Sequence, residues 1–134
     1  MTSFQTLEHV CDPLELVRGA RRLLKEGGAA LFVCHDRRAL SARVLGRKSP
    51  IFDIEHLQLF SPRSARRLLE QAGFSGIEIQ SIGNRYPLKY WLRLLPLPPS
   101  LKRALLALAR AARVGDFPLS LPAGNMAVVG YKIS

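Results

Sequence analysis

The sequence lacks several signals that would assign the chain to a familiar class. No G-x-G-x-x-G occurs, although such a glycine-rich turn is how a backbone usually approaches a nucleotide closely. No stretch reaches the roughly twenty apolar residues of a membrane span, and no secretory signal opens the chain. Cys11 and Cys34 are too few for a disulfide framework and indicate a reducing compartment. We therefore expect a single cytoplasmic domain, because 134 residues suffice for one hydrophobic core.

Acidic residues are few: 10 aspartates and glutamates stand against 20 lysines and arginines, for a formal net charge of +10. Such an excess implies attraction to an anionic partner: nucleic acid, an acidic membrane surface, or a phosphorylated or lipid-linked substrate. The alternative is that the basic side chains form solvated helix faces. Nucleic acid is the disfavoured partner, because the charge is spread over several helices instead of being interleaved with exposed aromatics on one surface.

Residues 1–34 predict two parallel strands joined by a helix. Residues 1–5 end a strand, and Ala30-Leu-Phe-Val-Cys34 is an uninterrupted apolar run, typical of a strand buried on both faces. Asp12 can serve as the N-cap of the intervening helix, with Pro13 at its first position. Gly27-Gly28 is expected to cap the helix at its carboxyl end. Because a unit of this length forms a right-handed crossover, the strands at 1–5 and 29–34 should be parallel neighbours.

The rest of the chain predicts further helices and two more strands. Asp36 can cap a short helix over 37–45, and Ser61-Pro62 starts a helix that ends at Gly73. Apolar and polar residues alternate over 76–82, which is typical of a half-buried strand, and 125–132 forms the last strand. Between these strands, aromatic, leucine and basic residues form a pair of helices, the second capped by Ser100, followed by a loop over 114–124.

Two motifs carry a family resemblance. The first is Leu7-Glu8-His9-Val10-x-Asp12-Pro13, continued by Leu24-Lys25-x-Gly27-Gly28 and a buried strand. The second is Glu55-His56-Leu57-x-Leu59-Phe60-Ser61-Pro62, followed by a helix ending Gln71-Ala72-Gly73-Phe74. In this order and spacing, the chain resembles the second half of a class I S-adenosylmethionine (SAM) methyltransferase domain, from the group that acts on quinones, lipids and sugars.

The resemblance implies an α/β fold: a partial Rossmann-like methyltransferase fold with about four strands, the last two antiparallel, flanked by helices. Residues 1–134 then form one partial domain, with a strand–helix–strand–helix–strand portion over 1–84, a basic and apolar helical insertion over 85–124 and the final strand over 125–134. In the family, the cofactor SAM lies over a glycine-rich turn in the first half of the domain. Since that half is missing, we expect this chain by itself to bind SAM poorly or not at all.

The turn at Leu7, Glu8 and His9 follows the carboxyl end of a strand, which is where open α/β sheets place their ligands. By the resemblance, this turn passes near the methionine end of SAM and near the substrate, so all three residues are candidate cofactor contacts. His9 is the first catalytic candidate, as a general base or as the group that orients the methylated atom. Alternatively, Glu8-His9 only fixes the start of the helix, because methyl transfer can proceed by positioning alone.

Glu55 and His56 form a second polar pair, in a segment over 51–60 that would close over the same sheet edge as a lid. Both are candidate substrate contacts, and His56 is the second catalytic candidate. Tyr86 and Trp91 are further candidate substrate contacts, since insertions at this point cover the substrate pocket in the family. The alternatives are a packing cluster before Ser61 for the first pair and a place in the core for Trp91.

A metal site is not predicted. Cys11, Cys34, His9 and His35 lie at the ends of strands that should be neighbours, so their side chains could converge. However, neither Cys-His pair has the spacing of a structural zinc motif. Buried free cysteines are the ordinary alternative.

The sequence thus predicts the C-terminal part of a SAM-dependent methyltransferase that acts on a small or lipid-linked acceptor. Its first strand leaves an open edge, so we expect residues 1–6 to pair with another copy of the chain or with a separate N-terminal half. One alternative is a non-catalytic remnant that serves as a pairing module. Another is an adaptor peripheral to an anionic membrane, which would use the basic, aromatic stretch 85–113.

Overall fold

The structure of the chain is a computed structural model that describes residues 1–46, 49, 51–52 and 54–133. It forms two compact units: Met1–Ile82 with Gly124–Ser134 (unit 1), and Gly83–Ala123 (unit 2). In chain order the elements are β1 (Thr2–Phe4), η1 (Leu7–His9), α1 (Pro13–Leu23), β2 (Ala29–His35), α2 (Leu40–Leu45), α3 (Pro62–Gln71), β3 (Ser75–Pro87), α4 (Leu88–Leu94), α5 (Pro99–Ala111) and β4 (Pro118–Tyr131).

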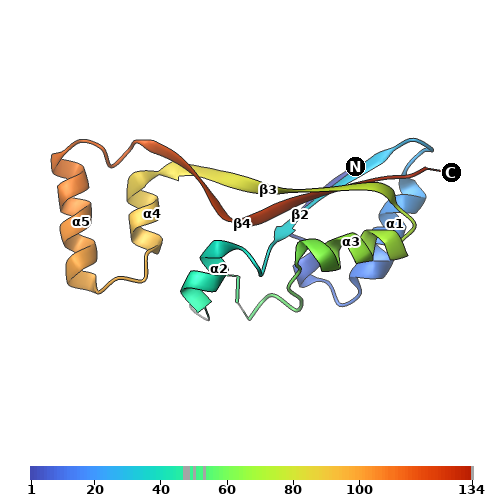
Figure 1. Cartoon of the computed structure of the whole chain (residues 1–134), viewed down its shortest axis with the longest axis horizontal. Helices are drawn as coiled ribbons and strands as arrows, with labels where there is room; N and C mark the ends of the chain where they lie inside the picture. Colours follow the sequence, from blue (N-terminus) through green and yellow to red (C-terminus); the bar gives the residue numbers. More distant parts are fainter. Residues whose placement is uncertain (47–48, 50, 53, 134) are drawn as a thin grey trace. The chain divides into compact units, whose positions relative to one another are not determined.

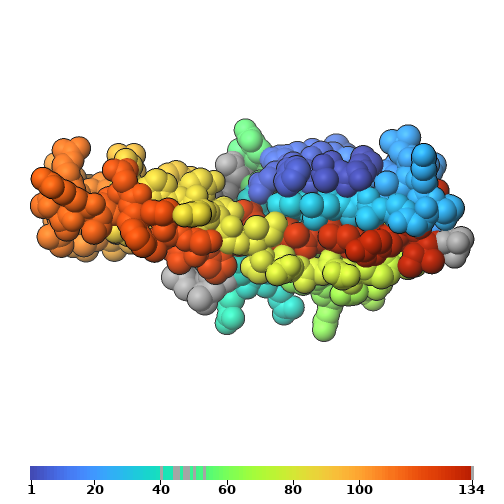
Figure 2. Space-filling view, turned by 90° about the horizontal axis from the view of Figure 1, so that it is seen from above, coloured from blue at the N-terminus to red at the C-terminus, as the bar shows by residue number. Residues whose placement is uncertain are grey.

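Unit 1 is built on a four-stranded sheet in the order β1–β2–β4–β3. β1 pairs in parallel with β2, whereas β4 is antiparallel to β2, from Ala29 opposite Tyr131 to His35 opposite Asn125. β3 and β4 are neighbours in the sheet and their arrows point in opposite directions, so the last two strands are antiparallel (Figure 1). In Figure 2 the strands form adjacent bands in dark blue, light blue, red and yellow-green. The predicted α/β fold is confirmed.

α1 forms where the sequence predicts a helix. The Asp12 carboxylate accepts a hydrogen bond from the Glu15 N–H at 3.0 Å, and a proline occupies the first turn. The helix ends at Leu23 and not at the glycine pair. Gly27, at φ +77°, instead turns the chain towards β2, and its N–H donates to the Lys132 carbonyl at 2.8 Å. The left-handed conformation is therefore needed by the connecting turn and not by a helix cap.

α3 is capped as predicted. The Ser61 hydroxyl accepts from the Ser64 N–H at 3.2 Å, and the Ser64 hydroxyl accepts from the Ser61 N–H at 2.8 Å. This reciprocal pair satisfies two N–H groups that a helix start otherwise leaves without partners. The helix buries one face beside α1, and the core between helices and sheet includes Leu7, Val17, Phe32, Cys34, Ala65, Leu69, Phe74, Met126 and Val128.

The helices of unit 1 lie on one face of its sheet (Figure 1), and the strands are visible directly from the opposite face (Figure 2). Burial along β4 agrees with this, because Met126 and Val128 are buried whereas the alternate residues Ala127 and Val129 are only half-buried. Phe4 lies on the same side as Ala127, through the register Phe4–Val33–Ala127, and is 63% exposed. Within the described part of unit 1, no helix covers this open face.

Four further predicted boundaries are wrong. β3, predicted over 76–82, covers Ser75–Pro87. α2 covers only Leu40–Leu45, because the Asp36 carboxylate accepts from the Arg38 N–H in a turn at 2.8 Å and caps no helix. β4 begins at Pro118, so most of the predicted loop over 114–124 is strand. α5 begins at Pro99 with Pro98 as its N-cap, which places Ser100 inside the first turn. In the predicted loop and lid over 46–60, Arg47, Lys48, Pro50 and Asp53 lie outside the described residues.

Unit 2 contains α4 and α5 between the ends of β3 and β4. The two helices pack against each other, and the Trp91 indole N–H donates to the Leu119 carbonyl at 3.1 Å. All residues of this unit are described, and Ala109 is its one buried residue. Nine of its large apolar side chains are exposed: Tyr86, Tyr90, Leu94, Leu95, Leu101, Leu108, Val114, Phe117 and Leu121. Among the helices that the structure describes, none has both the length and the apolar character needed to cross a bilayer.

Candidate functional site

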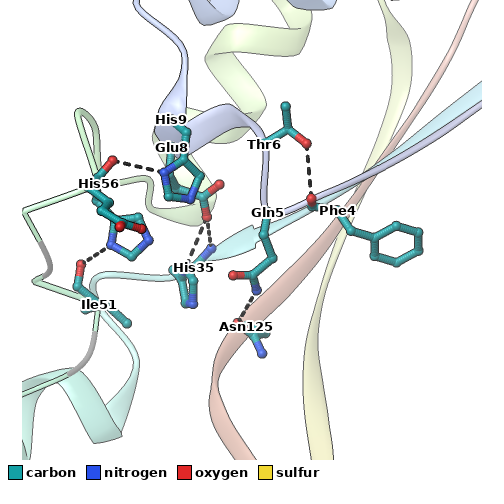
Figure 3. Close-up of polar contacts among 10 residues, drawn as sticks. Phe4, Gln5, Thr6, Glu8, His9, His35, Ile51, His56 and Asn125 are labelled. Atoms are coloured by element: carbon teal, nitrogen blue, oxygen red, sulfur yellow. Dashed lines mark hydrogen bonds and ion pairs between the residues drawn. The ribbon is translucent and has the colours of Figure 1, made fainter.

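The candidate site begins at η1, the short 3-10 helix that follows β1 at the carboxyl edge of the sheet. The backbone leaves β1 through Gln5, whose φ is +51°. This left-handed conformation is unfavourable for a residue other than glycine. Its backbone N–H donates to the Val33 carbonyl at 2.7 Å, and its side-chain amide donates to Asn125 at 3.2 Å (Figure 3). These contacts hold the turn to both β2 and β4.

Glu8 is completely buried and links η1 to the end of β2. Its Oε1 atom accepts from the backbone N–H of His35 at 2.6 Å and from the ring Nδ1–H of His35 at 3.1 Å (Figure 3). Its other oxygen, Oε2, is buried and has no hydrogen-bond partner among the described residues. Burial favours a raised pKa for this carboxyl, but the hydrogen bonds from His35 outweigh burial, so the pKa of Glu8 lies below its ordinary value.

Three imidazole rings gather beside this carboxylate, and we call Glu8, His9, His35 and His56 the Glu8–histidine cluster. The ring centroids of His9 and His56 are 4.9 Å apart, and those of His35 and His56 are 5.1 Å apart. His9 Nδ1 donates to the Glu55 carbonyl at 2.9 Å, and His56 Nδ1 donates to the Ile51 carbonyl at 2.8 Å (Figure 3). Since a carbonyl oxygen only accepts, the proton of each neutral ring is on Nδ1 and the lone pair is on Nε2.

The segment around His56 is fastened to η1 by its backbone. The Glu8 carbonyl accepts from the N–H groups of Leu57 at 2.9 Å and Gln58 at 3.3 Å. The Gln58 side chain donates to the Val10 carbonyl at 2.8 Å. With the bond from His9 to Glu55, these contacts hold the segment over the turn that follows β1. The predicted second polar pair therefore lies beside the first.

This arrangement can accept a proton or orient a polar ligand. A neutral imidazole with its Nδ1–H engaged presents Nε2 as a base, which is the form needed for general base catalysis. Glu8 fixes the ring of His35 through Oε1 and the strand end through the backbone N–H. Such an ordered set of groups at the carboxyl edge of strands β1 and β2 occupies the position where open α/β sheets bind ligands.

Comparison with known proteins identifies the family. Residues 1–79 match a family described as a methyltransferase domain. The chain belongs to the methyltransferase domain family. In fold it is similar to a SAM-dependent methyltransferase from Thermotoga maritima (TM-score 0.60, 18% identity), to one from Archaeoglobus fulgidus (0.57, 16%) and to the YcgJ protein from Bacillus subtilis (0.57, 18%). No curated protein matches the sequence.

These similarities extend over nearly all of this methyltransferase-family chain but over only part of its neighbours. They cover 98%, 98% and 99% of this chain, and 54%, 57% and 63% of the Thermotoga, Archaeoglobus and Bacillus chains. The chain thus spans little more than half the length of these structures. At such identities the likeness concerns the fold.

The residues of this methyltransferase domain fit only a part of a SAM site. The sequence contains no G-x-G-x-x-G turn that could cradle the nucleotide portion. Leu7 is 1% exposed and belongs to the core, so only its backbone remains for a ligand. Glu8 has one buried oxygen without a partner among the described residues, and His9 is exposed beside it. Glu8 and His9 thus offer polar groups for a ligand at this edge, whereas the sequence offers no glycine-rich turn for a nucleotide.

The structure brings Glu8, His9, Glu55 and His56 together, as the sequence analysis requires for a common site. Tyr86 and Trp91 belong to unit 2, where their rings lie 5.6 Å apart at the centroids. Their roles as substrate contacts stay predictions, as do the catalytic roles of His9 and His56.

Sequence reasoning missed His35 as a member of the site. It weighed His35 only as a metal ligand, although the signal for a site was present. His35 ends β2 just as Glu8 follows β1, and parallel neighbouring strands bring their carboxyl ends to one edge.

The two cysteines have different environments. Cys34 is fully buried, and burial, with the nearby carboxylates of Glu8 and Asp36, raises the pKa of its thiol to about 12. Cys11 is exposed. Among the residues that the structure describes, no group of histidine, cysteine and acidic side chains is placed to hold a metal ion.

Proposed function

We propose that this chain supplies the C-terminal half of a SAM-dependent methyltransferase domain whose acceptor is a small or lipid-linked molecule. The observation that carries the proposal is the Glu8–histidine cluster at the carboxyl edge of β1 and β2, in a chain of the methyltransferase domain family. His9 and His56 would act at the methylated atom, through Nε2, as bases or as orienting groups. Glu55, Tyr86 and Trp91 would contact the acceptor. Because methyl transfer is an in-line displacement, exact placement of the acceptor supplies much of the rate.

The same proposal includes a missing partner. The open face of the sheet carries half-buried apolar residues such as Val129, and parallel sheets of α/β proteins are normally covered on both faces. A cofactor-binding half with a glycine-rich turn would cover this face and extend the sheet beside β1. The complete protein would then act in the cytoplasm. The alternative function, a non-catalytic pairing module, uses the same surfaces without methyl transfer.

Calorimetric titration with SAM tests the proposal. We expect no saturable heat from this chain alone at micromolar SAM, because the glycine-rich turn for the nucleotide is missing. Micromolar affinity of the isolated chain would overturn the incomplete site. Reading the gene upstream of the Met1 codon is the companion test, and an in-frame glycine-rich turn is the expected result. In a complete protein, His9→Ala and His56→Ala should lower methyl transfer at unchanged SAM affinity, and full activity of both variants would refute the assigned roles.

A second candidate function rests on unit 2. Its 41 residues include seven lysines and arginines but one aspartate, and most of the large exposed apolar side chains of the described chain belong to it. Basic residues beside exposed leucine, tyrosine and phenylalanine side chains suit the surface of an anionic membrane. We propose peripheral membrane association through α4 and α5.

Co-sedimentation with vesicles tests this association. We expect the chain to sediment with vesicles that contain phosphatidylglycerol and to stay in solution with phosphatidylcholine alone. Leu101→Ser/Leu108→Ser should weaken sedimentation, because both side chains are exposed apolar groups of α5. The matched control is Leu23→Ser/Leu57→Ser, which removes two exposed leucines of unit 1. Equal binding to both kinds of vesicle, or equal loss in both variants, would remove this candidate.

A further inference from the structure

A hollow of unit 1 is lined by three arginines and one aromatic ring, and we call it the arginine hollow. Its described lining residues are Arg37, Arg38, Arg43 and Phe52, and its volume is about 630 Å³. This size lies within the range of small-molecule sites, roughly 300–1,000 Å³. Two of its lining residues, Arg37 and Arg38, come soon after His35 in the sequence, but none of its described lining residues belongs to the Glu8–histidine cluster.

The three guanidinium groups form no ion pair with another described residue. Its ion pairs join Arg22 to Glu15, His35 to Glu8, Lys89 to Asp116 and Lys132 to Glu26, and none of them includes an arginine of the hollow. Positive groups that line one hollow repel each other, and an anion bound among them would relieve this repulsion. A hollow lined by Arg63 and Arg66 differs, because the Asp36 carboxylate is also part of its lining.

The backbone around the arginine hollow is held on both sides. The Arg37 N–H donates to the Phe60 carbonyl at 2.9 Å, and the Arg43 N–H donates to the Ala39 carbonyl at 3.0 Å. On the other side, Phe52 follows Ile51, which is 3% exposed and whose carbonyl accepts from His56. These contacts hold the described backbone groups of the lining in place, which lowers the entropic cost of binding a ligand.

The chemistry of the lining selects the ligand. Guanidinium groups match phosphate oxygens with pairs of parallel hydrogen bonds, and a phosphate monoester carries a charge of about −1.5 to −2 at neutral pH. Phe52 is 46% exposed and offers an apolar ring beside these charges. We propose that the arginine hollow binds the phosphate group of an organic phosphate ester whose organic part packs on Phe52. This inference concerns binding alone, so it stands or falls independently of methyl transfer.

Titration calorimetry with phenyl phosphate and with inorganic phosphate tests the proposal. We expect saturable binding of phenyl phosphate, weakened on the order of tenfold for each arginine replaced by glutamine, because charge-assisted hydrogen bonds are lost. Phe52→Ala should weaken the binding of phenyl phosphate on the order of fivefold and leave the binding of inorganic phosphate unchanged, because only the ring contact is removed.

The matched control separates the hollow from net charge. Arg37→Gln/Arg38→Gln/Arg43→Gln and Arg63→Gln/Arg66→Gln/Arg67→Gln remove the same charge, and all six side chains are exposed, so neither variant should unfold. Only the first should lose phosphate binding. Equal losses in both variants, or no difference from the parent chain, would overturn the proposal.

A further arm distinguishes two sources of phosphate. Vesicles with phosphatidic acid present the group as a lipid headgroup, whereas phenyl phosphate presents it in solution. Arginine-dependent binding to the vesicles alone assigns the hollow to a headgroup, and binding of phenyl phosphate assigns it to a free ester. If neither probe binds in an arginine-dependent way, the phosphate site does not exist.

Discussion

At the scale of single residues, Glu8 joins the fold to the candidate site. Its buried carboxylate holds the end of β2 through the His35 N–H and the His35 ring through Nδ1, so one side chain connects two strand ends. Its second oxygen is buried without a hydrogen-bond partner among the described residues, which is unfavourable for stability. The contribution of these hydrogen bonds to stability can be tested through its dependence on pH.

Glu8→Gln should destabilise the chain by about 1–3 kcal/mol at neutral pH, because it removes a charge-assisted hydrogen bond in the core. The pKa of Glu8 in the folded chain lies below its ordinary value, so this stabilisation is complete above the unfolded pKa of roughly 4.3 and is lost as the pH falls through the folded pKa. Urea unfolding at pH 7 and near pH 3 measures the change.

The control for this variant is Glu15→Gln. The Glu15 carboxylate pairs with Arg22 at 2.7 Å on the surface, where such pairs contribute about 0–1 kcal/mol. The difference in unfolding free energy between the parent chain and Glu8→Gln should become smaller at acid pH. The unfolding free energy of Glu15→Gln should stay close to that of the parent chain at both pH values. A gap for Glu8→Gln that is constant with pH would contradict the assigned hydrogen bonds.

The cysteines give a second test at this scale. We expect a thiol reagent to modify Cys11 rapidly in the native chain and Cys34 only after unfolding, because Cys34 is buried and its thiol pKa is raised to about 12. Cys11→Ser should therefore abolish the fast phase, and Cys34→Ser should leave it intact. Rapid modification of both thiols in the native chain would be incompatible with the core described above.

At the scale of elements, the approach of β4 to α3 depends on a missing side chain. A Cβ atom at Gly130 would lie 2.9 Å from Leu69 Cδ2 and 3.0 Å from Phe74 Cβ. The second contact involves an atom fixed to the backbone, so a side chain cannot simply rotate away. β4 therefore packs closely on this part of the core only because residue 130 is glycine.

Gly130→Ala should destabilise unit 1 by about 1–3 kcal/mol through overpacking. Gly19→Ala is the matched control, since its Cβ would meet only the flexible Arg22 side chain, at 3.7 Å, and alanine in a helix is favoured by roughly 0.5–1 kcal/mol. Thermal unfolding should lower the midpoint for the first variant and raise it for the second. Equal midpoints would show that β4 has room at this position.

At the scale of the whole molecule, the open edge of β1 decides what the chain can pair with. The Met1 carbonyl accepts from the Leu31 N–H at 2.9 Å, and the Gln5 N–H donates to the Val33 carbonyl, so these groups face β2. Because backbone groups alternate along a strand, those of Thr2 and Phe4 point away from β2. The Thr6 hydroxyl covers one of them by donating to the Phe4 carbonyl at 3.0 Å. The backbone groups of β1 that stay open for pairing are few, which limits uncontrolled aggregation but still allows one strand of a partner to pair with β1.

Thr2→Pro/Phe4→Pro should abolish pairing through this edge, because proline removes the outward N–H groups and spares those that face β2. Thr2→Val/Phe4→Val is the control, since it changes the same side chains and keeps both N–H groups. Light scattering measures the mass of the chain alone and with a glycine-rich N-terminal half. A monodisperse monomer that binds no such half would falsify edge pairing.

The sequence alone determined the local elements with strong end signals. Asp12-Pro13 and Ser61-Pro62 start α1 and α3 because their caps act within a few residues, and the apolar run at 30–34 forms β2. The motifs around Glu8-His9 and Glu55-His56 also indicated the family and the position of the candidate site. Boundaries that depend on distant partners were predicted less well, since β4 extends to Pro118 by pairing with a strand far away in sequence.

Only the tertiary structure decided how these pieces combine. It placed His35 against Glu8 and beside His56, because parallel pairing of β1 with β2 brings two strand ends to one edge. It also showed that one face of the sheet is uncovered within the described unit 1 and that Leu101 and Leu108 of α5 are exposed. Local signals fix where helices and strands begin, whereas burial and side-chain contacts arise from pairing across the chain.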